Sequence, residues 1–103
     1  MSFSATAAGT SAGASATQAA ITGAKFIATS ISGHTDTDSV ITVESPAGTI
    51  LWQSAIDVSL EGVGFNFSGI YVPGVQDAAI VGKIASSTTD CQVNISGTES
   101  RKS

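Results

Sequence analysis

The sequence predicts an all-β protein, an antiparallel β-sandwich of jelly-roll-like type, and two observations support this prediction. First, the aliphatic side chains are mostly β-branched, because the 103 residues include 10 Ile and 8 Val but only 2 Leu. β-branched side chains suit a pleated, half-buried strand, and a chain poor in Leu is a poor candidate for helical packing. Second, apolar residues recur at every second position along most of the chain, which is the period of a strand with one buried face.

The alternation defines the strands that we expect. Residues 78–84 are more continuously apolar than the others, which is typical of a central strand. Gly, Pro, Ser and Asp separate the runs and predict turns at 32–36, 45–48, 61–62 and 73–77. Short strands at a spacing of about ten residues are typical of a sandwich, a barrel or a jelly roll. The expected strands are 21–31, 41–44, 50–52, 56–61, 63–68, 78–84 and 91–96.

The two ends of the chain differ from the part between them. Residues 1–20 are a low-complexity stretch of Ala, Ser, Thr and Gly, in which Phe3 is the only large side chain after Met1. Such a segment buries little by itself, so we expect either a flexible arm or an edge strand added to a neighbour. We expect the β-sandwich domain at 21–97 and a frayed polar tail at 98–103.

Charge and hydropathy exclude several classes of protein. The net charge is −4 and only four residues are Lys or Arg, so a nucleic-acid binder is not expected. No apolar run approaches the roughly 18 residues that span a bilayer, and we expect no signal peptide and no membrane partner. A single cysteine excludes a framework of disulfides within the chain and suggests synthesis in a reducing cytoplasm.

No catalytic or cofactor motif is visible, so we expect no enzyme and no cofactor. Cys91 shares the parity of Val93 and Ile95, which predicts a buried structural thiol. The segment from His34 to Asp38 places His, Asp and Asp at every second position and could hold a cation if extended. The alternative is a solvated turn, which we favour because further oxygen ligands are missing.

Three aromatic residues are candidates for an interface. Trp52 lies in a short apolar run and is either a core residue or an interface anchor, since Trp contributes strongly to binding. Tyr71 stands beside Pro73-Gly74, at the mouth of a predicted loop. Phe3 lies in the low-complexity start, where we expect it to contact a partner or a neighbouring subunit.

The order of these segments resembles that of small head decoration (cement) proteins of tailed bacteriophages. The resemblance covers residues 15–97 and lies in composition and order. It includes a Ser/Thr-rich strand after a Gly turn, a short hairpin, an alternating strand and a loop. The segments that carry it are Ile21–Ala24, Gly48–Trp52, Gly62–Phe67, Gly69–Gly74, Ala79–Ile84 and Cys91–Gly97.

The resemblance implies a structural virion protein without catalytic residues. Such proteins are jelly-roll-like sandwiches, often homotrimers, that sit on the outside of the capsid and bridge major capsid subunits. We therefore expect the major capsid protein as partner and the outer capsid surface as location, after synthesis in the host cytoplasm. The alternative is a receptor- or carbohydrate-binding module of a phage tail fibre or spike, in which Tyr71 would be the aromatic best placed to contact a glycan.

Overall fold

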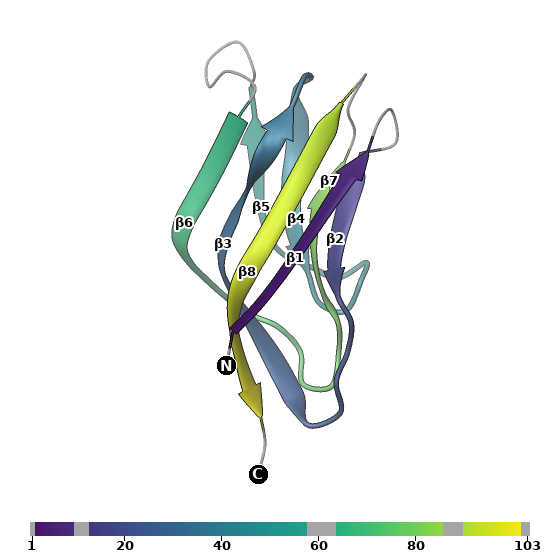
Figure 1. Cartoon of the computed structure of the whole chain (residues 1–103), viewed down its shortest axis with the longest axis vertical. Coiled ribbons are helices and arrows are strands. Elements are labelled where there is room, and N and C mark those ends of the chain that lie inside the picture. Colours follow the sequence, from purple (N-terminus) through teal and green to yellow (C-terminus); the bar gives the residue numbers. More distant parts are fainter. Residues whose placement is uncertain (1, 10–12, 58–63, 86–89, 102–103) are drawn as a thin grey trace.

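The computed structural model describes residues 2–9, 13–57, 64–85 and 90–101, which form two four-stranded antiparallel sheets packed face to face (Figure 1). The expected all-β sandwich is confirmed. The front sheet has the strand order β1-β8-β3-β6, and the back sheet has the order β2-β7-β4-β5. The strands are β1 (Ser2–Gly9), β2 (Ala14–Gln18), β3 (Ala24–Thr35), β4 (Ser39–Glu44), β5 (Ile50–Ile56), β6 (Gly64–Pro73), β7 (Ile80–Ile84) and β8 (Cys91–Arg101).

The strand pairing is that of a jelly roll. The first strand pairs with the last, the second with the seventh, the third with the sixth and the fourth with the fifth. Each of these pairs is antiparallel, so the chain follows the path of one long hairpin rolled into a sandwich. The additional pairings of β3 with β8 and of β4 with β7 complete the two sheets.

The chain start is the outermost part of both sheets. Of the two alternatives for residues 1–20, an arm or an edge strand, the structure has edge strands: β1 borders the front sheet and β2 borders the back sheet. The small side chains permit this, because Ala5 and Ala7 of β1 lie opposite the buried Ile95 and Val93 of β8 without crowding them. The sandwich therefore starts well before residue 21.

The chain end also belongs to the front sheet. β8 continues to Arg101, which lies opposite Ala24 of β3, so residues 98–101 are strand and not the frayed tail expected there. The long partner strand explains the difference, since β3 extends the ladder to this end. The Glu99 carboxylate forms an ion pair with Arg101 and its side chain is only 5% exposed.

Other boundaries differ from the expected ones in an informative way. β5 runs to Ile56, because Gln53, Ser54 and Ala55 continue the ladder with β4 although they do not alternate in polarity. β6 continues past Gly69, where a loop was expected. Gly69 has a φ of +78° and takes up a register shift, after which the strand resumes. Most of the strand expected at 56–61, and the turn at 61–62, lie outside the described residues.

The core lies between the sheets and consists mainly of β-branched side chains. β7 is a central strand, as expected, and lies between β2 and β4. Gly82 of β7 lets the sheets approach closely, since a Cβ atom there would stand 2.9 Å from Cβ of Ile95 and 3.1 Å from Cδ1 of Ile31. The largest fully buried side chains are Phe26, Ile31, Ile41, Ile56, Ile80, Ile84, Ile95, Val43 and Val93.

One buried hydroxyl fixes the loop that crosses from the front sheet to the back sheet. Ser45 follows β4 and is fully buried. Its Oγ donates to the carbonyl oxygen of Ala79 at 2.8 Å and accepts from the N–H of Val75 at 2.9 Å. The expected turn at 45–48 is present, because the N–H of Ser45 donates to the carbonyl oxygen of Thr49 at 3.0 Å.

The close approach at Gly82 gives a first prediction. Gly82→Ala should lower the free energy of unfolding by about 1–3 kcal/mol, because the added methyl group meets branched core side chains that cannot move away. Gly64→Ala is the matched control, since its Cβ would have no atom nearer than 3.8 Å and should change stability by less than about 0.5 kcal/mol. Urea unfolding measures both, and equal values would contradict the prediction.

Ser45 gives a second prediction. Ser45→Ala should cost about 1–3 kcal/mol of stability, because the carbonyl of Ala79 and the N–H of Val75 both lose their side-chain partner. Ser15→Ala on the exposed side of β2 is the control and should be close to neutral. Thermal unfolding of the two variants tests this, and an unchanged melting temperature for Ser45→Ala would refute the anchoring role.

Candidate functional site

The outer face of the front sheet is polar and uncharged along its middle rows. One row across β1, β8, β3 and β6 consists of Ser4, Ser96, Ser30 and Ser68. The hydroxyl oxygens of Ser30 and Ser96 lie 2.6 Å apart and share a hydrogen bond. Such a face presents short hydroxyl groups in an ordered array, so it can contact another surface through hydrogen bonds but offers no activated nucleophile.

The adjacent row is also polar and uncharged, but two of its four side chains are the larger amides of asparagine. It consists of Thr6, Asn94, Ser32 and Asn66, again from the four strands in order. Oγ1 of Thr6 donates to Oδ1 of Asn94 at 2.8 Å. Because cross-strand partners of this kind hold one another in place, the face is both polar and rigid.

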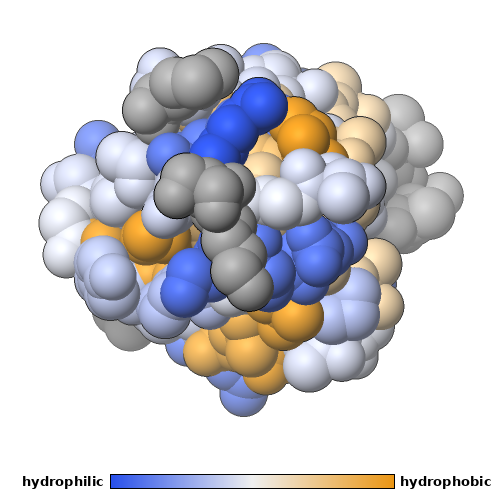
Figure 2. All heavy atoms as spheres, turned by 90° about the horizontal axis from the view of Figure 1, so that it is seen from below, coloured by the Kyte–Doolittle hydropathy of each residue, from blue (hydrophilic) through white to orange (hydrophobic). Residues whose placement is uncertain are grey.

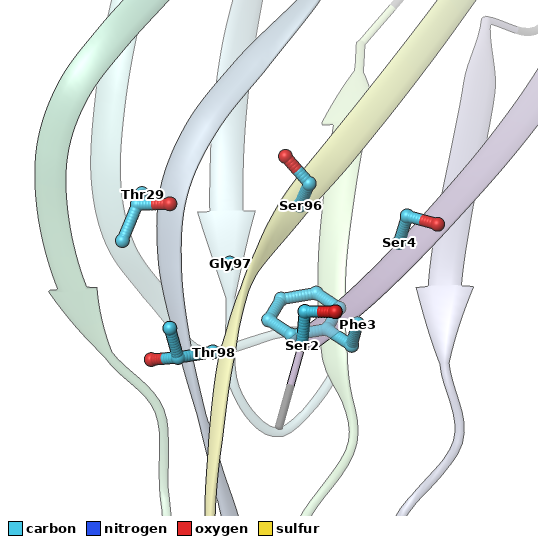
Figure 3. A pocket seen from close by; sticks show the side chains of 7 residues that line it. All are labelled: Ser2, Phe3, Ser4, Thr29, Ser96, Gly97 and Thr98. Atoms are coloured by element: carbon cyan, nitrogen blue, oxygen red, sulfur yellow. The ribbon is translucent and has the colours of Figure 1, made fainter.

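A shallow hollow of about 390 Å³ opens on the same face (Figure 3). The ladder between β3 and β8 shifts register between Ala28 and Ser30, which leaves Thr29 without a partner row. Gly97 lies beside this shift and approaches the backbone of β3 so closely that a Cβ atom on it would stand 1.9 Å from the carbonyl oxygen of Ile27. Hydroxyl groups dominate the lining and no ionisable side chain takes part. The lining residues are Ser2, Phe3, Ser4, Thr29, Ser96, Gly97 and Thr98.

Phe3 is a core residue. It was expected to be exposed in the low-complexity start and to contact a partner, but its side chain is only 6% exposed. Its ring packs edge-on against Phe26, with ring centroids 5.3 Å apart. The reason is the pairing of β1 with β8, which turns Phe3 inward over Gly97. The expectation that Phe3 is exposed is therefore wrong.

Trp52 combines features of the two alternatives considered for it, a core residue and an interface anchor. Its side chain is partly buried and packs against the core from β5. It meets Phe67 of β6 edge-on, with ring centroids 5.2 Å apart, so these two rings lie between the edge strands of the two sheets. Trp52 thus contributes to the core and keeps part of its surface accessible.

Tyr71 is the most exposed large hydrophobic side chain of the described residues. It lies on β6 and is 71% exposed. Its neighbour Val72 points inward and is buried opposite Ala28, so Tyr71 points to the outside of the front sheet. An aromatic ring in this position is free to contact a partner or stack on a sugar.

The remaining candidates form no reactive cluster. Cys91 is fully buried on the inward face, as expected. Nε2 of His34 lies 3.1 Å from Oδ2 of Asp90, which precedes β8, so the imidazole forms an ion pair when it is protonated. In the part of the chain that the structure describes, no three His, Cys, Asp or Glu side chains lie close enough together to bind a metal ion.

The carboxylate of Glu44, at the end of β4, is buried and has a structural role. Oε1 of Glu44 accepts a hydrogen bond from the N–H of Gly48 at 2.8 Å, and its Oε2 accepts one from Oγ1 of Thr42 at 3.1 Å. Glu44 therefore holds the turn between β4 and β5.

Among the described residues there is no helix with the length and apolarity needed to span a bilayer.

Comparison with known proteins identifies no relative: no family model, curated protein or solved structure matches this chain. A function has to be argued from the fold and from the surfaces just described.

One surface was missed by the sequence analysis. Ile50 and Leu51, at the start of β5, are 52% and 42% exposed. They lie on an edge strand with no charged residue and no proline between Ile50 and Ile56. That run without charge was visible in the sequence, but its position at the edge of a sheet depends on the topology.

The two aromatic residues Phe3 and Tyr71 give a third prediction. Phe3→Ala should lower the free energy of unfolding by about 3 kcal/mol, because it removes a buried ring from a thin core. Tyr71→Ala should change it by less than about 0.5 kcal/mol, since the side chain is exposed. Denaturant unfolding compares the two variants, and a neutral Phe3→Ala would show that Phe3 is not in the core.

Proposed function

We propose that this chain is a structural virion protein that binds the outside of a phage capsid and stabilises joints between major capsid subunits. The observation that carries the proposal is the kind of surface that the chain offers. It has a rigid, uncharged face of hydroxyl and amide groups, and the described residues assemble neither a catalytic set nor a metal-ligating set. A surface of this kind is suited to contact rather than to chemistry.

The dimensions of the sandwich fit such a role. The molecule measures 46 × 24 × 19 Å, so its broad faces are formed by the two sheets. A stable protein–protein contact buries about 800 Å² on each partner. The accessible surface of the chain is 5135 Å², so one broad face is large enough for such a contact. Two opposite faces would allow one copy to touch two neighbours.

Stabilisation of a shell needs no movement in the bound protein. A ligand that binds only the closed form of an assembly stabilises it by mass action, by an amount that rises with the free ligand concentration relative to Kd. A rigid sandwich loses little conformational freedom on binding, so more of its contact energy remains for the joint. The net charge of −4 suits a position away from packaged DNA.

The jelly-roll fold is compatible with this proposal but does not by itself select it. Jelly rolls occur in viral capsid proteins and in lectins, and a fold hosts many functions. The likeness in segment order to decoration proteins of tailed phages is what favours a capsid partner. The homotrimer and the location on the capsid stay predictions.

A second candidate function is a receptor- or carbohydrate-binding module of a tail fibre or spike. The exposed ring of Tyr71 favours it, because sugars stack on aromatic faces. The hydroxyl-lined hollow on the front sheet also offers hydrogen-bonding groups for a glycan. Loss of glycan binding in Tyr71→Ala, with the fold unchanged, would support this candidate.

The number of copies in purified source particles tests the proposal. Quantitative mass spectrometry against the major capsid protein should give a ratio near one, or one copy for every few capsid subunits. Purified protein added to heads that lack it should raise the temperature at which the shell opens, and the rise should grow with the concentration added. A handful of copies per particle would favour the receptor-binding candidate, and complete absence would refute both.

A further inference from the structure

The free edge of the back sheet is unusually open to strand pairing. β5 is the last strand of this sheet, and its described ladder is with β4. Natural edge strands are commonly guarded by lysine, proline, bulges or covering loops, because unpaired N–H and C=O groups attract other strands. β5 has no charged side chain and no proline from Ile50 to Ile56, and its first two side chains are exposed apolar ones.

The other described edges are less suited to pairing. β6 is interrupted by the register shift at Gly69, which has a positive φ. β1 and β2 lie against each other where the chain passes from one sheet to the other, since a Cβ on Gly9 would stand 1.9 Å from the carbonyl oxygen of Gly13. Figure 1 shows β5 and β6 on the side of the sandwich away from β1 and β2. The ladder of β5 with β4 also shifts register once, between Trp52 and Ile50, but from Trp52 to Ile56 it is regular, and this part of the edge carries no charge and no proline.

The direction of the backbone groups on β5 follows from the ladder of β4. The carbonyl of Val40 accepts a hydrogen bond of 3.1 Å from the residue that follows β7, so its backbone groups face β7. Backbone direction alternates along a strand, so the groups of Ile41 face β5, where Ser54 lies opposite. The groups of Ser54 therefore face β4, and those of Gln53 and Ala55 face the free edge.

We propose that β5 pairs with β5 of a second copy of this chain, antiparallel and across a two-fold axis at Gln53. The two back sheets then form one continuous sheet. In this register Gln53 lies opposite its own copy, and Leu51 lies opposite Ala55 of the second copy. The edge-facing groups of Gln53 thus meet those of its own copy, and Ala55 lies opposite Leu51, the residue at the register shift of β5.

The side chains and charges of β5 argue for its own copy as the occupant. The register places a large side chain opposite a small one in both flanking pairs, Leu51 against Ala55 and Trp52 against Ser54. No like charges come together, although the chain as a whole carries a net charge of −4. The exposed apolar surface of Ile50 and Leu51 lies at this edge and would be partly covered by the second copy.

This contact does not depend on the proposed function, and it implies a different oligomeric state. A two-fold contact between identical edges closes with two copies, whereas a trimer needs two different surfaces. The inference therefore replaces the expected homotrimer by a dimer, and the purified protein is sufficient to test it.

The mass of the purified chain in solution is the first measurement. Light scattering should give twice the chain mass of 10.2 kDa. Gln53→Lys should give a monomer, because it sets two lysines opposite each other, and Ala55→Pro should do so by removing an edge-facing N–H. Thr17→Lys, on the exposed side of β2 and opposite the uncharged Val81, is the matched control and should stay dimeric. A wild-type monomer or trimer, or a dimer that survives both β5 variants, overturns the proposal.

A cross-link gives a positive readout that does not depend on losing assembly. Directly opposite residues of a hydrogen-bonded antiparallel pair have Cα atoms about 5.5 Å apart, a separation that a disulfide can bridge. Gln53→Cys should therefore form a covalent dimer under mild oxidation, whereas Ser15→Cys should not. Native Cys91 is fully buried and present in both variants. Equal cross-linking of the two variants, or none in Gln53→Cys, contradicts the register.

Discussion

The pairing of the first strand with the last closes the jelly roll, and the rest of the structure depends on it. β1 lies in register with β8 along its whole length. It covers one border of the core with Phe3 and two alanines, and it leads directly into β2 at the same border of the other sheet. Without β1, the buried Val93 and Ile95 of β8 would lie at an open edge. The segment of lowest complexity is thus a structural part of the sandwich.

Small side chains are what let so few large ones form a core. Gly82 brings the back sheet so close to Ile95 that there is no room for a methyl group. Short polar side chains also cover the outside of the front sheet, where one row consists of four serines. An ordered, polar face without charge is useful for contact between surfaces and of no use for acid–base catalysis. The close packing of the two sheets and the uncharged outer face, on which the proposed role rests, therefore both follow from a composition rich in small residues.

The sequence predicted the fold class and the parity of the buried residues, since alternation directly reports one covered face of a strand. Cys91 is the clearest case. The sequence could not predict that Phe3 is buried. A stretch of Ala, Ser and Thr without large neighbours gives no periodic signal until a partner strand is known. The sequence also missed the length of β5, where Gln53 to Ala55 are held by the ladder of β4 rather than by their own polarity. Which strands lie at the edges is a property of topology alone.

Hydrogen exchange along β1 tests most directly whether the chain start closes the sandwich. The amides of residues 3–8 that face β8 should exchange slowly, close to the rate of the amides of β3, because they open only when the front sheet opens. Removal of the buried ring by Phe3→Ala should accelerate exchange at these positions first. Exchange of residues 3–8 at the rate of an unfolded chain, beside slow exchange in β3 and β8, would contradict the closed jelly roll.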